Sequence, residues 1–204
     1  MLAGWLAAEG SMVIILPKPS PTEQRLEECI RNRRSVRSYR QDTLSLDQIS
    51  NLLWSCQGIT DAAWKFRTVP SAGATFPLEL TVAKQDGVFR YIPLGHKLAR
   101  VSEKDVRPGL SAASWNQEFI KEAPAVFIIT AIYSRTTARY DERGIRYVHI
   151  EVGHAAQNLH LMAVALGLGS VPVGAFNDDE VKKVLKLAKD EIPLYLIPVG
   201  YKKE

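Results

Sequence analysis

The chain has 204 residues, of which 46% are hydrophobic and 24% are charged, and its formal net charge is +4 at pH 7. This length and composition are typical of one globular domain with a sizeable core. The weak positive charge favours small anionic ligands and argues against a nucleic-acid-binding protein, which needs a dense basic surface.

The N-terminal stretch 1–16 is apolar but is interrupted by a Glu-Gly-Ser sequence at 9–11. It lacks the basic start and the continuous apolar run of a secretory signal. We therefore expect an N-terminal arm over residues 1–21, extended at Lys18–Pro21, and a single domain over residues 22–204.

The two cysteines, Cys29 and Cys56, do not form a CxxC pair. They provide neither a disulfide framework nor a zinc site, and they indicate a reducing compartment, so we expect a cytoplasmic protein. The most continuous apolar region, 144–169, contains too many His, Gln and Asn residues to cross a membrane.

The first elements in the chain are predicted to be helices. One begins at Thr22 and carries the apolar stripe Leu26, Cys29 and Ile30. A second follows Ser45, where Gln48 completes a capping box, and it ends at Gly58. The stretch 59–75 is then irregular.

Strands follow at 78–83 and 88–92, and the Asp86-Gly87 dipeptide between them predicts a hairpin. The region 103–121 is predicted to form one or two helices. Residues 125–133 are continuously apolar, which is typical of a strand in the centre of a sheet.

The stretch 144–169 is the most informative part of the chain. Apolar residues recur there at helical spacing, which predicts a long and largely buried helix. Glu151, His154 and Asn158 form one polar stripe along it. We interpret this as a helix buried partly by its own chain and partly by a second copy; the alternative is a core helix whose polar groups have ordinary hydrogen-bond partners.

Glycines 167, 169 and 174 follow this helix, and glycine allows backbone N–H groups to approach a ligand closely. A short strand is predicted at 170–173, a helix at 178–187 capped by Asn177 or Asp178, and a last strand at 194–201. This order of helices and strands predicts the α+β class.

Two short motifs could bind a ligand. The sequence RRSVR contains Arg33, Arg34, Ser35 and Arg37, whose forked guanidinium groups and hydroxyl suit a phosphate; the alternative is a solvated basic patch. The sequence PSAGA at 70–74 could offer backbone donors to a ligand; the alternative is a plain loop.

The order of the motifs RRSVRSY, PSAGATFPLEL, RYVHIEVGHAAQNLHLMAVALGLGSVPVGAF and LYLIPVGY is more specific than any one of them. Over about residues 14–201 the chain resembles the nitroreductase superfamily of FMN enzymes. Within it the chain is most similar to the SagB-type dehydrogenases, the branch that contains the thiazoline and oxazoline oxidases of modified-peptide pathways.

The resemblance implies a nitroreductase-like α+β fold, with a central mixed sheet flanked by helices and the long buried central helix at a homodimer interface that also holds FMN. In this reading the phosphate and ribityl ligands are Arg33, Arg34 and Ser35, with Lys202 as a further phosphate contact. Arg37 lies beside the pyrimidine edge of the flavin. As an always-protonated cation, it would favour the anionic reduced state.

The same resemblance assigns the contacts of the flavin ring. The loop under the ring, donated by the other subunit, is Pro70, Ser71, Ala72 and Gly73. The segment that meets the ring near its N5 atom is Pro172, Val173 and Gly174. The implied reaction is hydride transfer through N5 from NAD(P)H to an acceptor such as a nitroaromatic or a quinone.

One feature departs from the azoline oxidases, which are associated with a Lys-Tyr pair just before the central helix. The matching residues here are Arg139 and Tyr140. Tyr140 is a candidate for proton transfer or, alternatively, a surface or interface aromatic, whereas Arg139 is a poor base because it stays protonated. A SagB-type dehydrogenase of a peptide azoline and a non-catalytic flavin-binding protein therefore remain alternative functions.

Metal-dependent classes are excluded by spacing. Glu151-x-x-His154 matches half of a di-iron site, but the chain has no second Glu-x-x-His. A His-Glu-x-x-His zinc motif is also missing, so no metal is expected.

Overall fold

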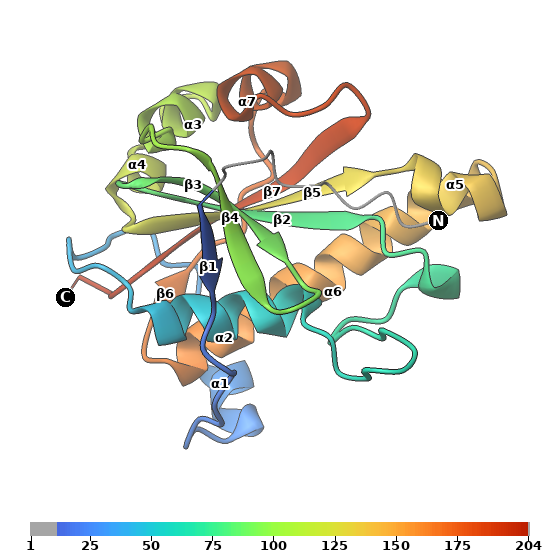
Figure 1. Cartoon of the computed structure of the whole chain (residues 1–204). Coiled ribbons are helices and arrows are strands. Elements are labelled where there is room, and N and C mark those ends of the chain that lie inside the picture. Colours follow the sequence, from blue (N-terminus) through green and yellow to red (C-terminus); the bar gives the residue numbers. More distant parts are fainter. Residues whose placement is uncertain (1–11, 204) are drawn as a thin grey trace.

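A seven-stranded sheet runs through the middle of the molecule in the order β1-β4-β3-β2-β5-β7-β6 (Figure 1). The computed structural model describes residues 12–203. The strands are β1 (Val13–Ile15), β2 (Leu78–Lys84), β3 (Gly87–Ile92), β4 (Lys97–Ser102), β5 (Ala125–Ile132), β6 (Gly169–Ser170) and β7 (Glu191–Gly200). The helices are α1 (Leu26–Asn32), α2 (Leu46–Gln57), α3 (Arg107–Ala113), α4 (Glu118–Glu122), α5 (Ser134–Tyr140), α6 (Arg143–Ala165) and α7 (Asp178–Leu185), with a 3₁₀ turn, η1, at Ala72–Ala74.

The predicted α+β class is confirmed, and the sheet is antiparallel at each pairing of its described strands. Parallel pairing is limited to the bridge between Ser35 and Ser170, so the mixed character expected of the sheet is confined to that point. Of the expected N-terminal arm, residues 1–11 lie outside the described part of the chain, and β1 pairs with β4.

Strand β5 occupies the centre of the sheet, as its apolar sequence predicts. It pairs with β2 on one side and β7 on the other, with Ile128 opposite both Thr81 and Leu196. Because side chains of a strand alternate between its faces, Phe127 and Ile129 join the core on one face, and Ile128 joins the core on the other.

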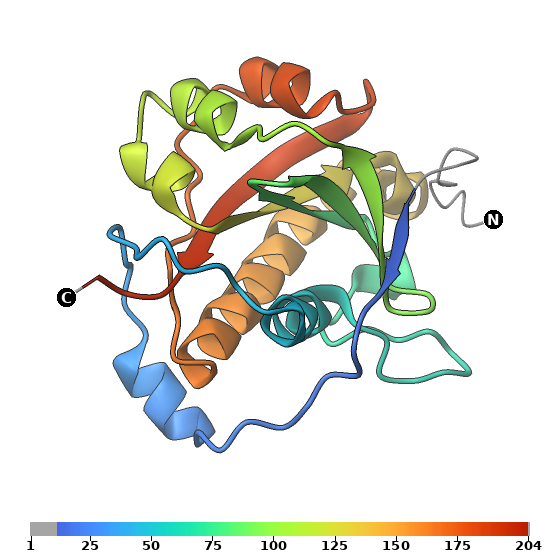
Figure 2. The same ribbon diagram turned by 60° about the vertical axis from the view of Figure 1, so that its left-hand side comes forward.

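Helices cover both faces of the sheet, which Figure 2 shows from a second side. Helices α2 and α6 pack on one face around side chains such as Leu52, Leu53 and Leu159. Helices α3, α4 and α7 cover the other face through Leu110, Ile120 and Val181. The capping box of Ser45 and Gln48 and the Asn177 cap are both confirmed.

Helix α6 is buried along one side and open along the other. Val148, Ala155 and Leu159 are fully buried, whereas Ile145 and Ile150 are 41% and 49% exposed. The predicted polar stripe is not one surface: Glu151 is buried, Asn158 is half-buried and donates to the Ser55 carbonyl at 3.1 Å, and His154 is exposed. The alternative interpretation is confirmed for Asn158, which has an ordinary partner in its own chain, whereas burial of the exposed face by a second copy stays a prediction.

Several local predictions are wrong. Helix α1 begins at Leu26 rather than at Thr22, and it buries Cys29 while leaving Leu26 and Ile30 exposed. Strands β1 and β4 and helix α5 were not predicted. Their sequences carry weak periodic patterns, and long-range contacts hold them, such as the bond from Arg135 of α5 to the Phe76 carbonyl at 3.0 Å.

Two other predicted elements are shorter than expected. Helix α6 ends at Ala165, because Leu166 caps it and Gly167 adopts a left-handed φ of 73°. Strand β6 covers only Gly169–Ser170, and Val173 adds an isolated bridge to Leu196. None of the helices in residues 12–203 combines the length and apolar character needed to cross a membrane.

Candidate functional site

The arginine segment 33–37 lies beside β6, although the two are more than a hundred residues apart in sequence. Val36 N–H donates to the Ser170 carbonyl at 3.1 Å, next to the bridge between Ser35 and Ser170. A Cβ atom at Gly169 would lie 2.8 Å from the Val36 side chain, so only glycine permits this approach. The fold therefore places the arginines next to the segment Pro172–Gly174, which follows β6 directly.

Arg33 is held in place by a buried histidine. Its Nη1 donates to His160 Nε2 at 3.0 Å, and His160 Nδ1 is hydrogen-bonded to Ser170 Oγ. Since Nε2 must accept from the guanidinium, the proton of the neutral ring is assigned to Nδ1. Burial, together with the Arg33 charge, lowers the pKa of His160 to about 4. His160 is thus neutral at pH 7 and leaves the charge of Arg33 uncompensated.

The other cations of the predicted phosphate site also lie at this end of the molecule. Arg34 donates to the Arg33 carbonyl at 2.7 Å, and the Arg37 guanidinium lies 5.8 Å from the centre of the Phe119 ring. Exposed Lys202 pairs with Tyr39, two residues after Arg37. Within residues 12–203, no ion pair neutralises Arg33, Arg34 or Arg37.

The loop 70–74 forms the second part of the predicted site. Ser71 Oγ accepts from the Phe76 amide at 3.0 Å, which fixes the loop to the start of β2. Gly73 has φ = 58°, and a Cβ there would lie 2.6 Å from Tyr140 Oη and 2.9 Å from Arg139 Nη1. Arg139 Nη1 also donates to the Gly73 carbonyl at 3.1 Å. The structure therefore brings the Arg139-Tyr140 pair against this loop, as the sequence could not show.

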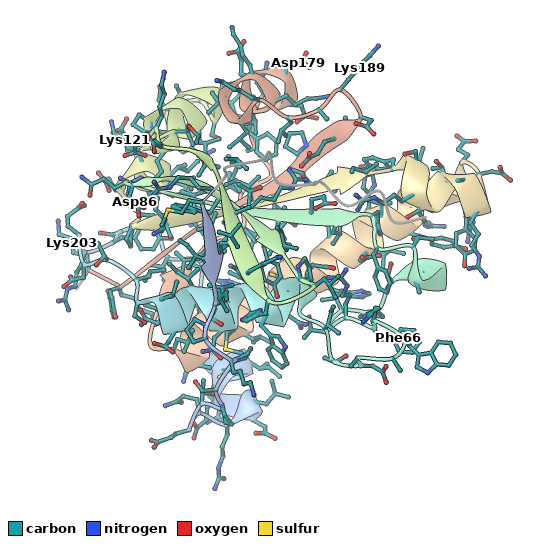
Figure 3. The ribbon with its side chains drawn as sticks, viewed as in Figure 1. Phe66, Asp86, Lys121, Asp179, Lys189 and Lys203 are labelled. Atoms are coloured by element: carbon teal, nitrogen blue, oxygen red, sulfur yellow. The ribbon has the colours of Figure 1, made fainter. Side chains whose placement is uncertain are left out.

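A cavity of about 510 Å³ opens beside the loop. It is lined by the loop itself, by Arg139 and by residues of the preceding segment, including Phe66, which Figure 3 labels at the outer edge of the molecule. Pro70 and Gly73 are exposed, and Ser71 and Ala72 are half-buried. Tyr140 is half-buried and packs edge-on against Tyr147 of α6, with ring centres 5.1 Å apart.

The two groups of predicted ligands lie at different ends of α6. His160 is hydrogen-bonded to Arg33, and Glu151 lies beside Ser71. These two helix positions are nine residues apart, which corresponds to about 13 Å along the helix axis. In Figure 1, α1 lies near one end of α6 and α5 lies at the opposite end. Gly73 of η1 lies beside Tyr140 of α5. The two groups therefore lie at different positions along this helix.

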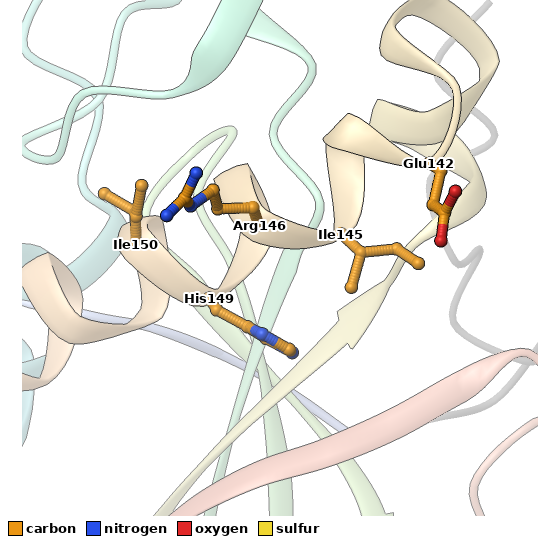
Figure 4. A pocket seen from close by; sticks show the side chains of 5 residues that line it. All are labelled: Glu142, Ile145, Arg146, His149 and Ile150. Atoms are coloured by element: carbon orange, nitrogen blue, oxygen red, sulfur yellow. The ribbon is translucent and has the colours of Figure 1, made fainter.

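The open face of α6 connects these two ends. Glu142, Ile145, Arg146, His149 and Ile150 line a shallow hollow of about 430 Å³ on this face, seen closely in Figure 4. Exposed Gly153, His154 and Gln157 continue the face at helical spacing. Ile145 and Ile150 make part of this face apolar, and exposed apolar side chains grouped in this way are typical of a surface that another molecule covers.

The sequence pattern of the Nitroreductase family matches residues 30–201, which is most of the chain. The chain belongs to the nitroreductase family. A Methanocaldococcus jannaschii protein, MJ1384, provisionally named a nitroreductase, is 48% identical over 192 residues, covering 91% of this chain and 96% of its own. Nitroreductase-family proteins are in general oxidoreductases and typically form homodimers with flavin.

Two further similarities support this membership. A crystal structure of a Ralstonia eutropha protein, also provisionally named a nitroreductase, superposes with a TM-score of 0.86 at 28% identity, over 94% of this chain and 90% of its own. The FMN reductase (NADPH) of Bacillus subtilis is 23% identical over 85% of this chain, which spans 64% of that protein. The nitroreductase-like fold predicted from the motifs is thus confirmed.

Sequence reasoning missed residues that act behind the predicted ligands. His160 and Ser170 position Arg33, and Gln57 and Arg67 lie beside Glu151. His160 sits among apolar residues with no motif around it, so no signal in the sequence could have identified its partner.

Proposed function

We propose that this nitroreductase-family protein is an FMN-dependent oxidoreductase that transfers a hydride from NAD(P)H to an acceptor such as a nitroaromatic or a quinone. The observation that carries the proposal is the separation of two ligand groups along α6 by an uncovered helix face. A second copy that packs its own α6 antiparallel on this face would place Arg33 of one chain near the 70–73 loop of the other. Each pair of chains would then form two complete sites.

The arginine segment fits the phosphate end of FMN. Arg33, Arg34 and Ser35 offer forked guanidinium donors and a hydroxyl to a doubly charged group, and Lys202 adds a point charge. These cations have no carboxylate partner in the described chain, which leaves them available to an anion. The Arg37 guanidinium would lie at the pyrimidine edge and stabilise negative charge there.

The glycine-containing segments fit the flavin ring. The backbone of the Pro70–Gly73 loop allows a flat ring to approach, while the missing Cβ of Gly73 makes room for Tyr140 and Arg139. Pro172–Gly174 offers a backbone N–H that does not titrate. Bound FMN would supply the hydride-transfer chemistry at N5, while the protein binds and orients it. The name of the Bacillus subtilis relative, FMN reductase (NADPH), supports both the cofactor and the nicotinamide donor.

The first experiment is an absorbance spectrum of the purified protein, followed by anaerobic addition of NADH and NADPH. We expect a flavin band that bleaches. A flavin band that does not bleach would favour one of two alternatives: a SagB-type dehydrogenase, whose own substrate reduces the flavin, or a flavin-binding protein. The position of Tyr140 beside Gly73 is compatible with the dehydrogenase. No flavin band after incubation with FMN would contradict the proposal.

The shared site requires a dimer, which a matched pair of variants can test. Ile150 is 49% exposed on the open face of α6, and Ile15 is 78% exposed on β1. We expect Ile150→Glu to produce monomers that lose FMN, because it places a charge in an apolar interface, and Ile15→Glu to stay dimeric. A monomeric Ile150→Glu protein that holds FMN tightly would contradict the shared site.

The two free cysteines, Cys29 and Cys56, are both buried thiols. They fit a reducing compartment, and we place the enzyme in the cytoplasm on this ground.

A further inference from the structure

A cluster of polar side chains is buried beneath the 70–73 loop, where α2 meets α6. Glu151 of α6 is 3% exposed and Gln57 of α2 is 2% exposed. In the described structure, Glu151 Oε1, Gln57 Nε2 and the nearby Arg67 Nε are all buried without a hydrogen-bond partner. Each such atom costs about 1–3 kcal/mol, so three of them in one cluster require an explanation.

The Ser71 and Gln57 side chains lie within hydrogen-bonding reach of the Glu151 carboxyl, although Glu151 Oε1 and Gln57 Nε2 form no bond of ordinary geometry. Ser71, Gln57 and Arg67 all stabilise its charged form. Arg67 Nη1, however, donates to the Gln57 carbonyl at 2.9 Å, and Ser71 Oγ accepts from Phe76. Polar groups arranged in this way suit a bridging water molecule, which can carry a proton between them.

The cluster also reaches the proposed flavin site. Ser71 and Arg67 line the cavity of about 510 Å³ together with Pro70 and Gly73. Glu151 therefore lies behind Ser71, which belongs to the loop that we place under the flavin ring. Negative charge that arrives on the ring would act on the Glu151 carboxyl through a short and poorly solvated distance.

We propose that Glu151 takes up a proton from solvent when the bound flavin is reduced and returns it when the flavin is reoxidised. NAD(P)H delivers a hydride, which adds negative charge and no proton; the Glu151 carboxylate binds a proton and compensates this charge. A quinone that accepts the hydride needs one further proton to complete its reduction. The O–H bond of the Glu151 carboxyl breaks to supply this proton. This inference rests on the proposed function.

The surroundings of Glu151 make this exchange accessible near neutral pH. Burial raises its pKa to about 7, against the opposing effects of Ser71, Gln57 and Arg67. Arg67 is the cation that faces the carboxyl; burial lowers its own pKa, Tyr91, Glu79 and Glu151 oppose this effect, and Arg135 adds to it. A carboxyl held at this balance changes its protonation when one nearby charge changes.

The test measures protons rather than turnover. The flavin-loaded protein is reduced anaerobically in weakly buffered solution with a pH indicator, and the protons taken up per flavin are counted between about pH 6 and 8. We expect Glu151→Gln to lose a measurable fraction of this uptake. The matched control is Glu122→Gln, which removes an exposed carboxylate on α4 and should behave like the wild type.

The outcomes separate this inference from the proposed function. A Glu151→Gln protein that binds and reduces FMN with wild-type proton uptake would overturn the role of Glu151 alone. Failure of the wild type to bind FMN would overturn both proposals. If Glu151→Gln does not fold, the wild type decides: proton uptake no greater than that of free FMN under the same conditions would also overturn the inference.

Discussion

Two groups of arginines in this protein have opposite surroundings. Arg90 is 8% exposed and forms a double hydrogen bond with Glu191 at 3.1 and 2.9 Å, while Glu79 lies 3.3 Å away. Arg33, Arg34 and Arg37 form no ion pair within the described residues, and they are half-buried or exposed.

The difference in burial explains why only one group is paired. A charge inside the fold must be paired, because its desolvation cost is large, and Arg90 meets carboxylates from β2 and β7. A charge at the surface can remain unpaired because water solvates it. The arginine segment thus keeps its charge available to an anion, whereas the sheet network is complete without a ligand.

The largest effect is expected from breaking the buried network. Arg90→Ala should lower the free energy of unfolding by about 3–5 kcal/mol, because it leaves the buried carboxylate of Glu191 without its cation, whereas Glu79 keeps Arg135. The control is Arg37→Ala, from the open group of unpaired arginines (Arg33, Arg34 and Arg37). It should change the free energy of unfolding by no more than about 0.5 kcal/mol. Urea unfolding in the absence of FMN measures both, and equal losses would contradict the distinction between the two groups.

The histidine behind Arg33 should make stability depend on pH. The pKa of His160 is lowered from 6.5 to about 4, so its stabilising contribution is complete above pH 6.5 and is lost as the pH falls through 4. The difference between these two pKa values corresponds to a change of at most about 3 kcal/mol in the free energy of unfolding. We expect the stability of His160→Gln to depend less on pH over this range than that of the wild type, as measured by unfolding at several pH values. Parallel plots of stability against pH for the two proteins would show that His160 does not titrate in this way.

Removing single arginines from the open group should weaken cofactor binding. We expect Arg33→Ala and Arg37→Ala each to raise the dissociation constant for FMN by about 10–100-fold, because each loses a charge-assisted contact worth about 1.5–3 kcal/mol. Arg40→Ala is the matched control, since Arg40 is exposed and already pairs with Asp42 at 2.8 Å. Fluorescence titration measures the dissociation constants. Full flavin retention by both variants would contradict the assignment of Arg33 and Arg37 as FMN ligands.

The smallest effect is expected from inorganic phosphate alone. If the open arginines form an anion site, millimolar phosphate should raise the melting temperature of the flavin-free protein by about 1–3 °C. Arg34→Ala should reduce this shift. Sodium chloride at matched ionic strength is the control, and an identical shift with chloride would indicate general screening instead of a site.

Much of the fold was predictable because its signals are local. The capping box at Ser45, the Asn177 cap and the apolar run of β5 each depend on a few neighbouring residues. The elements that were missed, β1, β4 and α5, have no such signal. They form because the sheet edge and the packing of Arg135 on the β2 region hold them.

The candidate site was predicted in pieces. The sequence indicated Arg33–Arg37, Pro70–Gly73 and Pro172–Gly174 as motifs, and the structure joins the first to the third through the bridge between Ser35 and Ser170. The residues behind these motifs could not be predicted, because contacts such as Arg33 to His160 connect positions more than a hundred residues apart.

The sequence by itself determined the family and the α+β class, since these follow from the order and identity of residues along the chain, and it predicted which segments bind the cofactor. The tertiary structure alone decided which charges are paired, where Tyr140 and Glu151 lie, and that the two ligand groups stand at separate ends of α6. The physical reason is that pairing and burial depend on distances across the fold, which packing sets after the local elements have formed.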